Sequence, residues 1–250
     1  MDPVSSAGFA RGAEVYDRAR PEYPDRTVDW ALERLGLRSG SVVVDLAAGT
    51  GKLTRALVAR GLNAVAVDPS SEMLAQLRTA LSHLDVREGT AEAIPLEDAT
   101  ADAVTVGQAF HWFEPQPALR EIHRVLRPNG GLAFFTNFRK VDDPVQAAWE
   151  EIVRDAKTSV RDRESVDQPA EIARSGLFGE IEELEEDWTQ YLGVDEFVDL
   201  VASRSYVVRL ADPERERILS EIRAVAELLP DPIPFRYVTQ VRIARRLQAR

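Results

Sequence analysis

One short stretch limits the possible folds of this chain more than any other. Residues 41–54 read Ser-Val-Val-Val-Asp-Leu-Ala-Ala-Gly-Thr-Gly-Lys-Leu-Thr. Three consecutive β-branched valines predict a strand that is buried on both faces, and the apolar spacing over 53–60 predicts a helix. In the turn between them, Gly49 and Gly51 can adopt positive φ without cost. Since the helix directs its free N–H groups into this turn, the stretch predicts a nucleotide cradle at the carboxyl end of a strand.

Two familiar nucleotide motifs do not match this turn. A P-loop requires Gly, four residues and then Gly-Lys-Ser/Thr, but Leu46 stands in place of the first glycine and Leu53 follows the lysine. A dinucleotide fingerprint requires G-x-G-x-x-G directly after the strand, and Ala47, Gly49 and Gly51 have a different spacing. A strand–turn–helix unit without a ligand remains an alternative for this stretch alone.

A second carboxylate follows the next predicted strand. Residues 64–68 form a short apolar run that ends in Asp68, about twenty residues after the glycine turn. At this spacing an acidic side chain can accept hydrogen bonds from both hydroxyls of a ribose. An Asp in this position is more often only the N-cap of the following helix, although Ser70 could cap that helix instead. Met73 is expected either to cover a face of an adenine or to pack in the core.

Further strands are predicted over 84–88 and 103–107, and their loops should reach the same edge of the sheet. Ligands of open α/β sheets bind outside that edge. The loop after the second of these strands is aromatic and contains His111, with Trp112 beside it. His111 is interpreted as a substrate contact or a general base, because its unperturbed pKa lies near neutrality; a structural histidine beneath the loop is the alternative.

Several motifs resemble one superfamily. A strand ending in Asp45 and followed by A-x-G-T-G resembles the first motif of class I S-adenosylmethionine (SAM)-dependent methyltransferases. The Tyr16…Arg20-Pro-Glu-Tyr-Pro element, the Gln-Ala-Phe-His-Trp-Phe string at 108–113 and "RVLRPNGG" at 124–131 also resemble it. The resemblance is to the ubiquinone-biosynthesis-like and trans-aconitate-methyltransferase-like branch. It covers residues 9–137 well and the remainder loosely.

The resemblance implies an α/β fold with a Rossmann-like, doubly wound sheet of seven strands, six parallel and one antiparallel. It also implies an N-terminal helix and a helical cap over the site. We expect a single methyltransferase domain over 1–250: a flexible arm at 1–8, a SAM-binding core at 9–137, a largely helical cap with late strands at 138–234, and a final strand and tail at 235–250.

Spacing and capping residues predict the other elements. Asp25 is the expected N-cap of a helix that ends at Gly36. Further helices are predicted over 117–126, 144–158, 168–175, 195–209 and 213–228, and further strands over 132–136, 180–192 and 235–243.

The resemblance also implies roles for individual residues. Arg20 would hold the SAM carboxylate and Tyr16 would wall the methyl site. Thr90 stands where the family often has an acidic residue beside the adenine. The implied cofactor-binding residues are Tyr16, Arg20, Asp45, Ala47, Gly49, Gly51, Asp68, Met73, Thr90, Ala91, Glu92, Gln108 and Ala109. The candidate substrate residues are His111, Trp112, Trp149, Arg204, Ser205 and Tyr206, and the candidate bases are His111 and Tyr16.

Composition narrows the function classes. The chain has no cysteine, which excludes disulfides and a cysteine nucleophile, and no metal site is expected. Its net charge of −11 argues against a nucleic-acid partner. Neither a signal peptide nor a membrane span is predicted, so we expect a cytoplasmic monomer or homodimer that acts on a small molecule.

The predicted function is methyl transfer from SAM to a small-molecule acceptor, with S-adenosylhomocysteine as the second product. A SAM- or nucleotide-binding regulatory module without turnover would retain the same cofactor motifs and is the first alternative. An NAD(P)-dependent oxidoreductase is a further alternative, disfavoured by the glycine spacing. The methyl acceptor and the methylated atom do not follow from the sequence.

Overall fold

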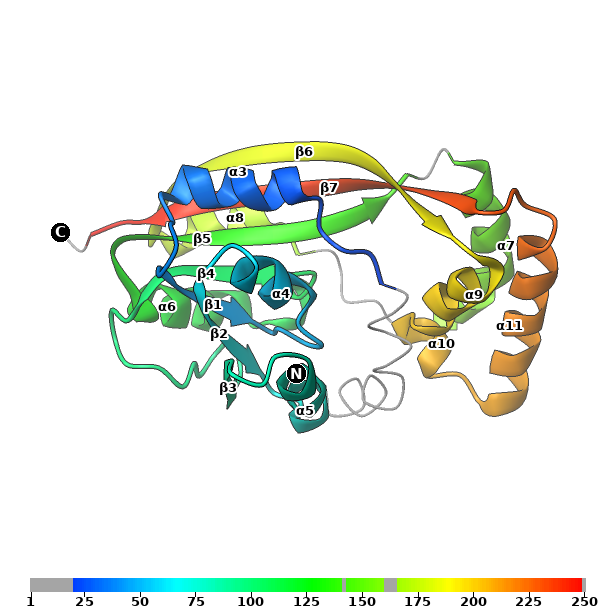
Figure 1. The fold of residues 1–250 in the computed structure, drawn as a ribbon, viewed down its shortest axis with the longest axis horizontal. Coiled ribbons are helices and arrows are strands. Elements are labelled where there is room, and N and C mark those ends of the chain that lie inside the picture. Colours follow the sequence, from blue (N-terminus) through cyan, green and yellow to red (C-terminus); the bar gives the residue numbers. More distant parts are fainter. Residues whose placement is uncertain (1–19, 141–142, 160–165, 249–250) are drawn as a thin grey trace.

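The computed structural model describes residues 20–140, 143–159 and 166–248. The predicted arm at 1–8, the predicted N-terminal helix before Arg20 and Tyr16 lie outside these residues. The described chain contains a seven-stranded sheet in the order β3-β2-β1-β4-β5-β7-β6 (Figure 1). The strands are β1 (Val42–Leu46), β2 (Asn63–Asp68), β3 (Asp85–Glu88), β4 (Ala101–Gly107), β5 (Leu126–Arg139), β6 (Phe178–Leu192) and β7 (Ile233–Arg246).

Strand direction confirms the predicted sheet. Strands β1 to β5 pair in parallel, whereas β7 lies antiparallel to both of its neighbours, β5 and β6. Six strands therefore share one direction and one is reversed. The valines of the opening stretch occupy the centre, where Val44 pairs with Val65 on one side and Val104 on the other. A strand with neighbours on both edges and helices on both faces requires such an apolar run.

Helices cover both faces of the sheet. Helices α3 and α4 pack with Val43, Ala133 and Val241 on one face, and α6 and α8 pack with Val44 and Phe134 on the other. The helices are α3 (Asp25–Leu35), α4 (Lys52–Val58), α5 (Ser71–Ala80), α6 (Pro115–Val125), α7 (Pro144–Ser159), α8 (Gln168–Ser175), α9 (Val194–Ala202), α10 (Ser205–Val208) and α11 (Asp212–Ala226), with a 3-10 turn η1 (Phe110–Trp112).

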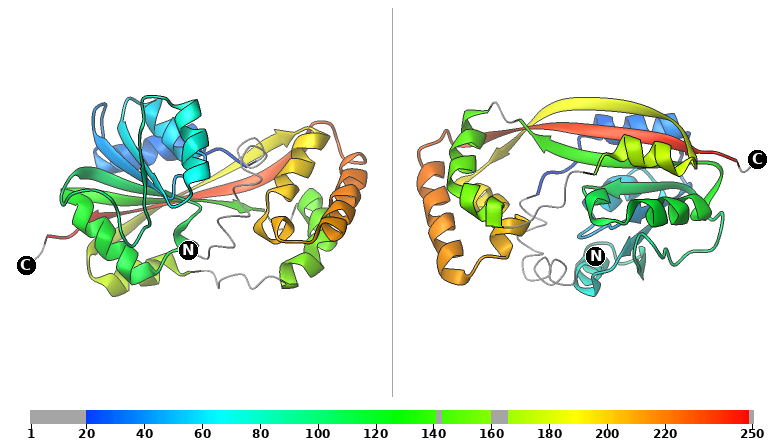
Figure 2. Two further views of the ribbon diagram at one scale, coloured as in Figure 1. Left: turned by 90° about the horizontal axis from the view of Figure 1, so that it is seen from below. Right: turned by 180° about the vertical axis from the view of Figure 1, so that it is seen from behind.

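A second core lies at one end of the long strands. Figures 1 and 2 show β6 and β7 extending beyond β1 to β4 to reach the group of helices α7, α9, α10 and α11. There Trp149 and Phe197 pack against Phe235 and Tyr237 of β7. The Trp149 and Phe235 rings stack with centroids 5.3 Å apart. The long strands thus connect the sheet core to the helices that carry Arg204.

Two local predictions are wrong. Asp25 does not cap α3: Pro24 occupies the N-cap position, and the Asp25 carboxylate is 2.8 Å from Arg60 in the turn after α4. The predicted helix over 195–209 is two helices, because the backbone at Arg204 is extended (φ −74°, ψ 138°). Each half buries its own apolar face in the second core, which a single straight helix could not do for both.

Strand β5 begins earlier than predicted. Residues 127–131, between the helix predicted over 117–126 and the strand predicted over 132–136, form an irregular first part of β5, where the register to β4 shifts and Asn129 has φ +67°. Asparagine tolerates this left-handed conformation better than most residues. The remaining boundaries differ from the predictions by a few residues.

The acidic run of β6 is an exposed strand edge that pairs with basic side chains. Glu183 is 2.5 Å from Arg242 of β7, and Asp187 is 2.7 Å from Lys140 of β5. Arg26 on α3 pairs with the same strand.

Among the helices that the structure describes, none combines the length and the apolar character needed to span a lipid bilayer.

Candidate functional site

The turn after β1 has the backbone that its small residues predict. Ala47, Gly49 and Gly51 have φ values of +57°, +56° and +87°. An added Cβ at Gly49 would meet no atom within 4 Å, so that position faces open space. An added Cβ at Gly51 would lie 2.2 Å from Cδ1 of Leu77, so that position allows α5 to pack closely against the turn. The turn therefore offers open backbone on one side and is fixed by packing on the other.

Asp45 is buried at the end of β1, beneath the turn. Its carboxylate accepts hydrogen bonds from the hydroxyls of Thr54 (2.5 Å) and Thr105 (3.1 Å). Burial raises the pKa of Asp45 to about 6, the charge of Asp68 adds to this rise, and the two hydroxyl bonds oppose it. A cation bound in front of Asp45 would favour its ionised form.

Asp68 is a link between the turn and β2. Its carboxylate accepts hydrogen bonds from the backbone N–H groups of Gly49 and Ser70, each at 2.8 Å. Burial raises its pKa, and the two backbone bonds oppose that rise. Each carboxylate oxygen retains a second lone pair, so both can still accept a bond from a ligand hydroxyl.

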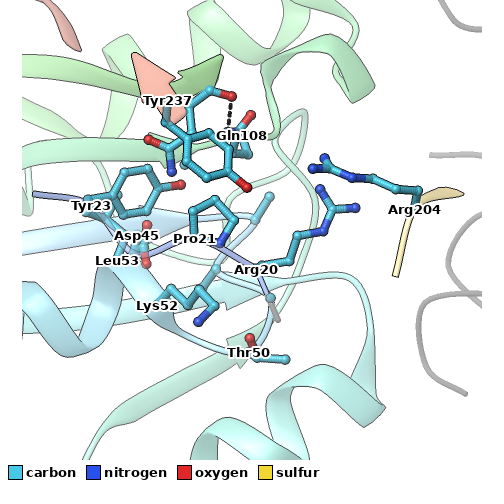
Figure 3. A pocket seen from close by; sticks show the side chains of 15 residues that line it. Arg20, Pro21, Tyr23, Asp45, Thr50, Lys52, Leu53, Gln108, Arg204 and Tyr237 are labelled. Atoms are coloured by element: carbon cyan, nitrogen blue, oxygen red, sulfur yellow. Dashed lines mark hydrogen bonds between the residues drawn. The ribbon is translucent and has the colours of Figure 1, made fainter. Parts of the chain in front are cut away.

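A cleft opens beside the turn, which we call the glycine-turn cleft (Figure 3). It lies at the carboxyl ends of β1 and β4 and is open to solvent, with a volume of about 620 Å³ that includes this open space. Tyr23 and Tyr237 form the wall of the cleft that faces the turn, and Lys52 and Arg20 lie at the sides of the cleft (Figure 3). The lining residues are Arg20, Pro21, Tyr23, Asp45, Ala47, Ala48, Gly49, Thr50, Lys52, Leu53, Gly107, Gln108, Asn137, Arg204 and Tyr237.

A smaller cleft of about 260 Å³ lies on the other side of Ala47, and we call it the Trp112 cleft. Ala47 lines both clefts, and Pro69, which lines the smaller one, directly follows Asp68. Asp68 therefore sits between the two clefts. The smaller cleft is lined by Ala47, Pro69, Gly89, Thr90, Ala91, Glu92, Trp112 and Phe113.

Two arginines lie side by side at the outer end of the glycine-turn cleft. Arg20 donates to the hydroxyl of Ser203 (3.1 Å) and to its carbonyl oxygen (2.9 Å), which fixes the guanidinium beside α9. The next residue, Arg204, also lines the cleft, and its guanidinium lies 5.1 Å from the ring centroid of the buried Trp149. Ser203 and Arg204 lie between α9 and α10, where the extended backbone at Arg204 separates the two helices and brings both residues to the cleft.

The structure brings the predicted residues together in two groups. Arg20, Asp45, Ala47, Gly49, Gln108 and Arg204 line the glycine-turn cleft. Ala47, Thr90, Ala91, Glu92 and Trp112 line the Trp112 cleft. The predicted residues Gly51, Asp68, Met73, Ala109, His111, Trp149, Ser205 and Tyr206 line neither of these clefts.

Several of these other residues have a structural position instead. Met73 and Trp149 are buried, and Gly51 is the N-cap of α4. His111 is half-buried and its ring lies 4.7 Å from that of Trp112, beside the smaller cleft rather than beside Arg204. Tyr16 lies outside the described residues.

The cleft residues that were not among the predicted site residues include Tyr23, Lys52, Asn137 and Tyr237. Tyr23 belongs to the Tyr16…Arg20-Pro-Glu-Tyr-Pro element, and an added Cβ at Gly107 would lie 2.6 Å from its hydroxyl oxygen, so this glycine makes room for it. Tyr237 lies on β7 and its side chain packs in the second core. Its position at the cleft depends on the register between β7 and β5. No local pattern in the sequence marks that register.

The strand order, the reversed β7 and the glycine turn after β1 define the class I methyltransferase fold. A family model described as methyltransferase domain matches residues 44–134. The chain is 42% identical over 228 residues to an uncharacterized methyltransferase of Mycobacterium tuberculosis strain H37Rv, a match that covers 90% of this chain and 88% of the relative. The chain therefore belongs to the methyltransferases.

A solved structure gives the same result. A protein from Anaeromyxobacter dehalogenans assigned as a type II methyltransferase aligns with a TM-score of 0.65 and 25% identity, covering 90% of this chain and 97% of that one. The narrower branch has weaker support: the ubiquinone/menaquinone biosynthesis C-methyltransferase of Rubrivivax gelatinosus is 42% identical over 96 residues, which is 37% of this chain and 38% of that one.

Proposed function

We propose that one molecule of SAM spans the two clefts and that a small-molecule acceptor binds at the Arg204 end of the larger one. The chain is a SAM-dependent methyltransferase. The observation that carries the placement is the shared wall: Ala47 lines both clefts, and Asp68 lies between them. We place the amino-acid moiety beside the glycine turn and the nucleobase at Trp112, so that the intervening ribose would meet Asp68.

The residues of the two clefts fit this ligand. The open space in front of Gly49 permits close approach of a ligand to the backbone. Asp45, buried in the cleft wall, offers a carboxylate to an ammonium or sulfonium group, and Arg20 offers an oriented guanidinium to a carboxylate. Asp68 has lone pairs available for the two ribose hydroxyls.

The chemistry requires little from side chains beyond positioning. SAM supplies a methyl group on a sulfonium that is already activated for direct displacement. The protein aligns the acceptor with that methyl group and excludes water. A base is needed only when the acceptor retains its proton until attack. His111 and Tyr16 stay predictions for that role; the described position of His111 is next to Trp112.

Thermal unfolding with separately added ligands tests the cofactor placement. S-adenosylhomocysteine at ~100 times its dissociation constant should stabilise the fold by ~2.7 kcal/mol, a rise in Tm of roughly 5–10 °C for a chain of this length. NAD and NADP should give no rise. A rise with a nicotinamide cofactor alone would contradict the assignment of the clefts.

A variant pair tests the ribose contact. Asp68→Ala should weaken the binding of S-adenosylhomocysteine by about 10- to 150-fold, which corresponds to about 1.5–3 kcal/mol for hydrogen bonds to a charged group. Asp85→Ala is the control, because this carboxylate is exposed at the start of β3, where it pairs with Arg87. Equal affinities in the two variants, measured by titration calorimetry, would remove Asp68 from the cofactor site.

A further inference from the structure

We propose that the methyl acceptor carries a carboxylate and that Arg204 binds this carboxylate. The proposal rests on the proposed function, because it names the substrate class of the same site. Arg204 precedes α10 and lines the glycine-turn cleft at the end away from Thr50 and Lys52 (Figure 3). It therefore stands where the cleft meets the second core, beyond the part of the cleft that the glycine turn forms.

The guanidinium of Arg204 has binding capacity that the described protein does not use. Its Nε and Nη2 atoms are buried and make no hydrogen bond of normal geometry among residues 20–140, 143–159 and 166–248, although the guanidinium interacts with the Tyr237 side chain. Buried donors are almost always satisfied, so an unsatisfied pair in a cleft wall indicates a ligand. Nε and Nη2 lie on one edge of the guanidinium, and that edge matches the two oxygens of a carboxylate.

Arg204 lies close to other arginines. Arg139 and Arg204 lie 4.7 and 5.1 Å from the ring centroid of Trp149, and Arg20 is held against Ser203. Glu150 pairs with Arg139 at 2.6 Å. An anion bound at Arg204 would therefore lie among cationic groups.

The neighbouring phenols do not supply the missing negative charge. Burial raises the pKa of Tyr206 and that of Tyr237, so both hydroxyls stay neutral near pH 7. Burial and the charge of Arg204 lower the pKa of Arg139, which shows that the two cations repel each other. A monoanion at Arg204 would relieve this repulsion and satisfy both buried donors.

The carboxylate of the cofactor is the other possible occupant, and the positions favour Arg20 for it. Arg20 lies between Thr50 of the glycine turn and Arg204 (Figure 3). Its Nε and Nη2 atoms already bind Ser203, which fixes its orientation in the cleft. A carboxylate beside the turn therefore meets Arg20 first, and Arg204 is left for the acceptor.

The test uses four proteins: the wild type, Arg204→Gln, Arg204→Lys and the control Arg217→Gln, which removes an exposed arginine on α11. The first measurement is the affinity for S-adenosylhomocysteine and for 5′-methylthioadenosine, which has the same thioether nucleoside but no amino-acid moiety. We expect Arg204→Gln to change neither affinity by more than twofold. A loss of tenfold or more for S-adenosylhomocysteine alone would assign Arg204 to the cofactor and overturn the proposal.

The second measurement compares benzoate, hexanoate and adipate with benzamide, hexanamide and adipamide, each added to protein saturated with S-adenosylhomocysteine. We expect at least one carboxylate to bind tenfold or more tightly than its amide. Arg204→Gln should abolish this preference, Arg204→Lys should retain part of it through charge alone, and Arg217→Gln should retain all of it.

The outcomes separate the two proposals. If wild-type protein does not bind S-adenosylhomocysteine, the proposed cofactor site is wrong. If it binds this ligand but prefers no carboxylate over its amide, or keeps the preference in Arg204→Gln, the carboxylate proposal is wrong and the cofactor site stands. Thermal unfolding of each variant checks that the substitution leaves the fold intact.

Discussion

Replacement of Asp45 by asparagine tests the electrostatics beneath the glycine turn. The Asp45 carboxylate is 1% exposed and has two hydroxyl donors, Thr54 at 2.5 Å and Thr105 at 3.1 Å. Burial outweighs both bonds and raises the pKa from 3.8 to about 6. An asparagine has almost the same shape, offers one carbonyl acceptor, and has no charge at any pH.

The sign and size of the effect follow from proton linkage. Between pH 4 and pH 6 the native state binds more protons at Asp45 than the unfolded state does, so the free energy of unfolding falls as pH rises. Ionisation of the buried Asp45 lowers the free energy of unfolding by about 3 kcal/mol above pH 7 and by about 1 kcal/mol at pH 4.5. Asp45→Asn removes this dependence. The variant should therefore gain stability relative to the wild type as pH rises. The difference in free energy of unfolding, variant minus wild type, should be about 2 kcal/mol higher at pH 8 than at pH 4.5.

Urea denaturation at the two pH values measures this difference. Glu216→Gln is the matched control, because Glu216 is an exposed carboxylate on α11 and its amide should behave alike at both pH values. The comparison between pH values cancels any constant loss of hydrogen bonding in Asp45→Asn. A change smaller than about 0.5 kcal/mol, or one of opposite sign, would show that Asp45 is ionised throughout this range and would refute the argument.

Two glycine substitutions test the packing of the cleft. Gly51→Ala should lower the free energy of unfolding by roughly 1–3 kcal/mol more than Gly36→Ala in urea denaturation, because both have positive φ but only the first brings a Cβ within 2.2 Å of Leu77. Equal losses would mean that Leu77 moves without cost. Gly107→Ala should lower the affinity for S-adenosylhomocysteine, measured by titration calorimetry, because the new Cβ would lie 2.6 Å from the Tyr23 hydroxyl oxygen. An unchanged affinity would exclude Tyr23 from the wall of the cofactor site.

Elements fixed by local patterns could be predicted from the sequence. The valine run of β1 and the acidic strand ends at Asp45 and Asp68 are local, and the structure places them as expected. Helix α8 has the predicted bounds, Gln168–Ser175, because Asp167 caps one end and Gly176 adopts φ +64° at the other. Where a local signal competes with a tertiary partner the prediction is wrong, as at Asp25, whose carboxylate pairs with Arg60 in the turn after α4.

The sequence by itself determined the sheet, the glycine turn and the edge of the sheet where the clefts lie, because burial, φ preference and helix capping act within a few residues. Only the tertiary structure placed Ser203 beside Arg20, 183 positions apart in the chain, and brought Tyr237 and Arg204 to the same cleft. These contacts depend on the register of β7 and on the break before α10. Such long-range geometry is the sum of many packing interactions and leaves no signature in any single segment.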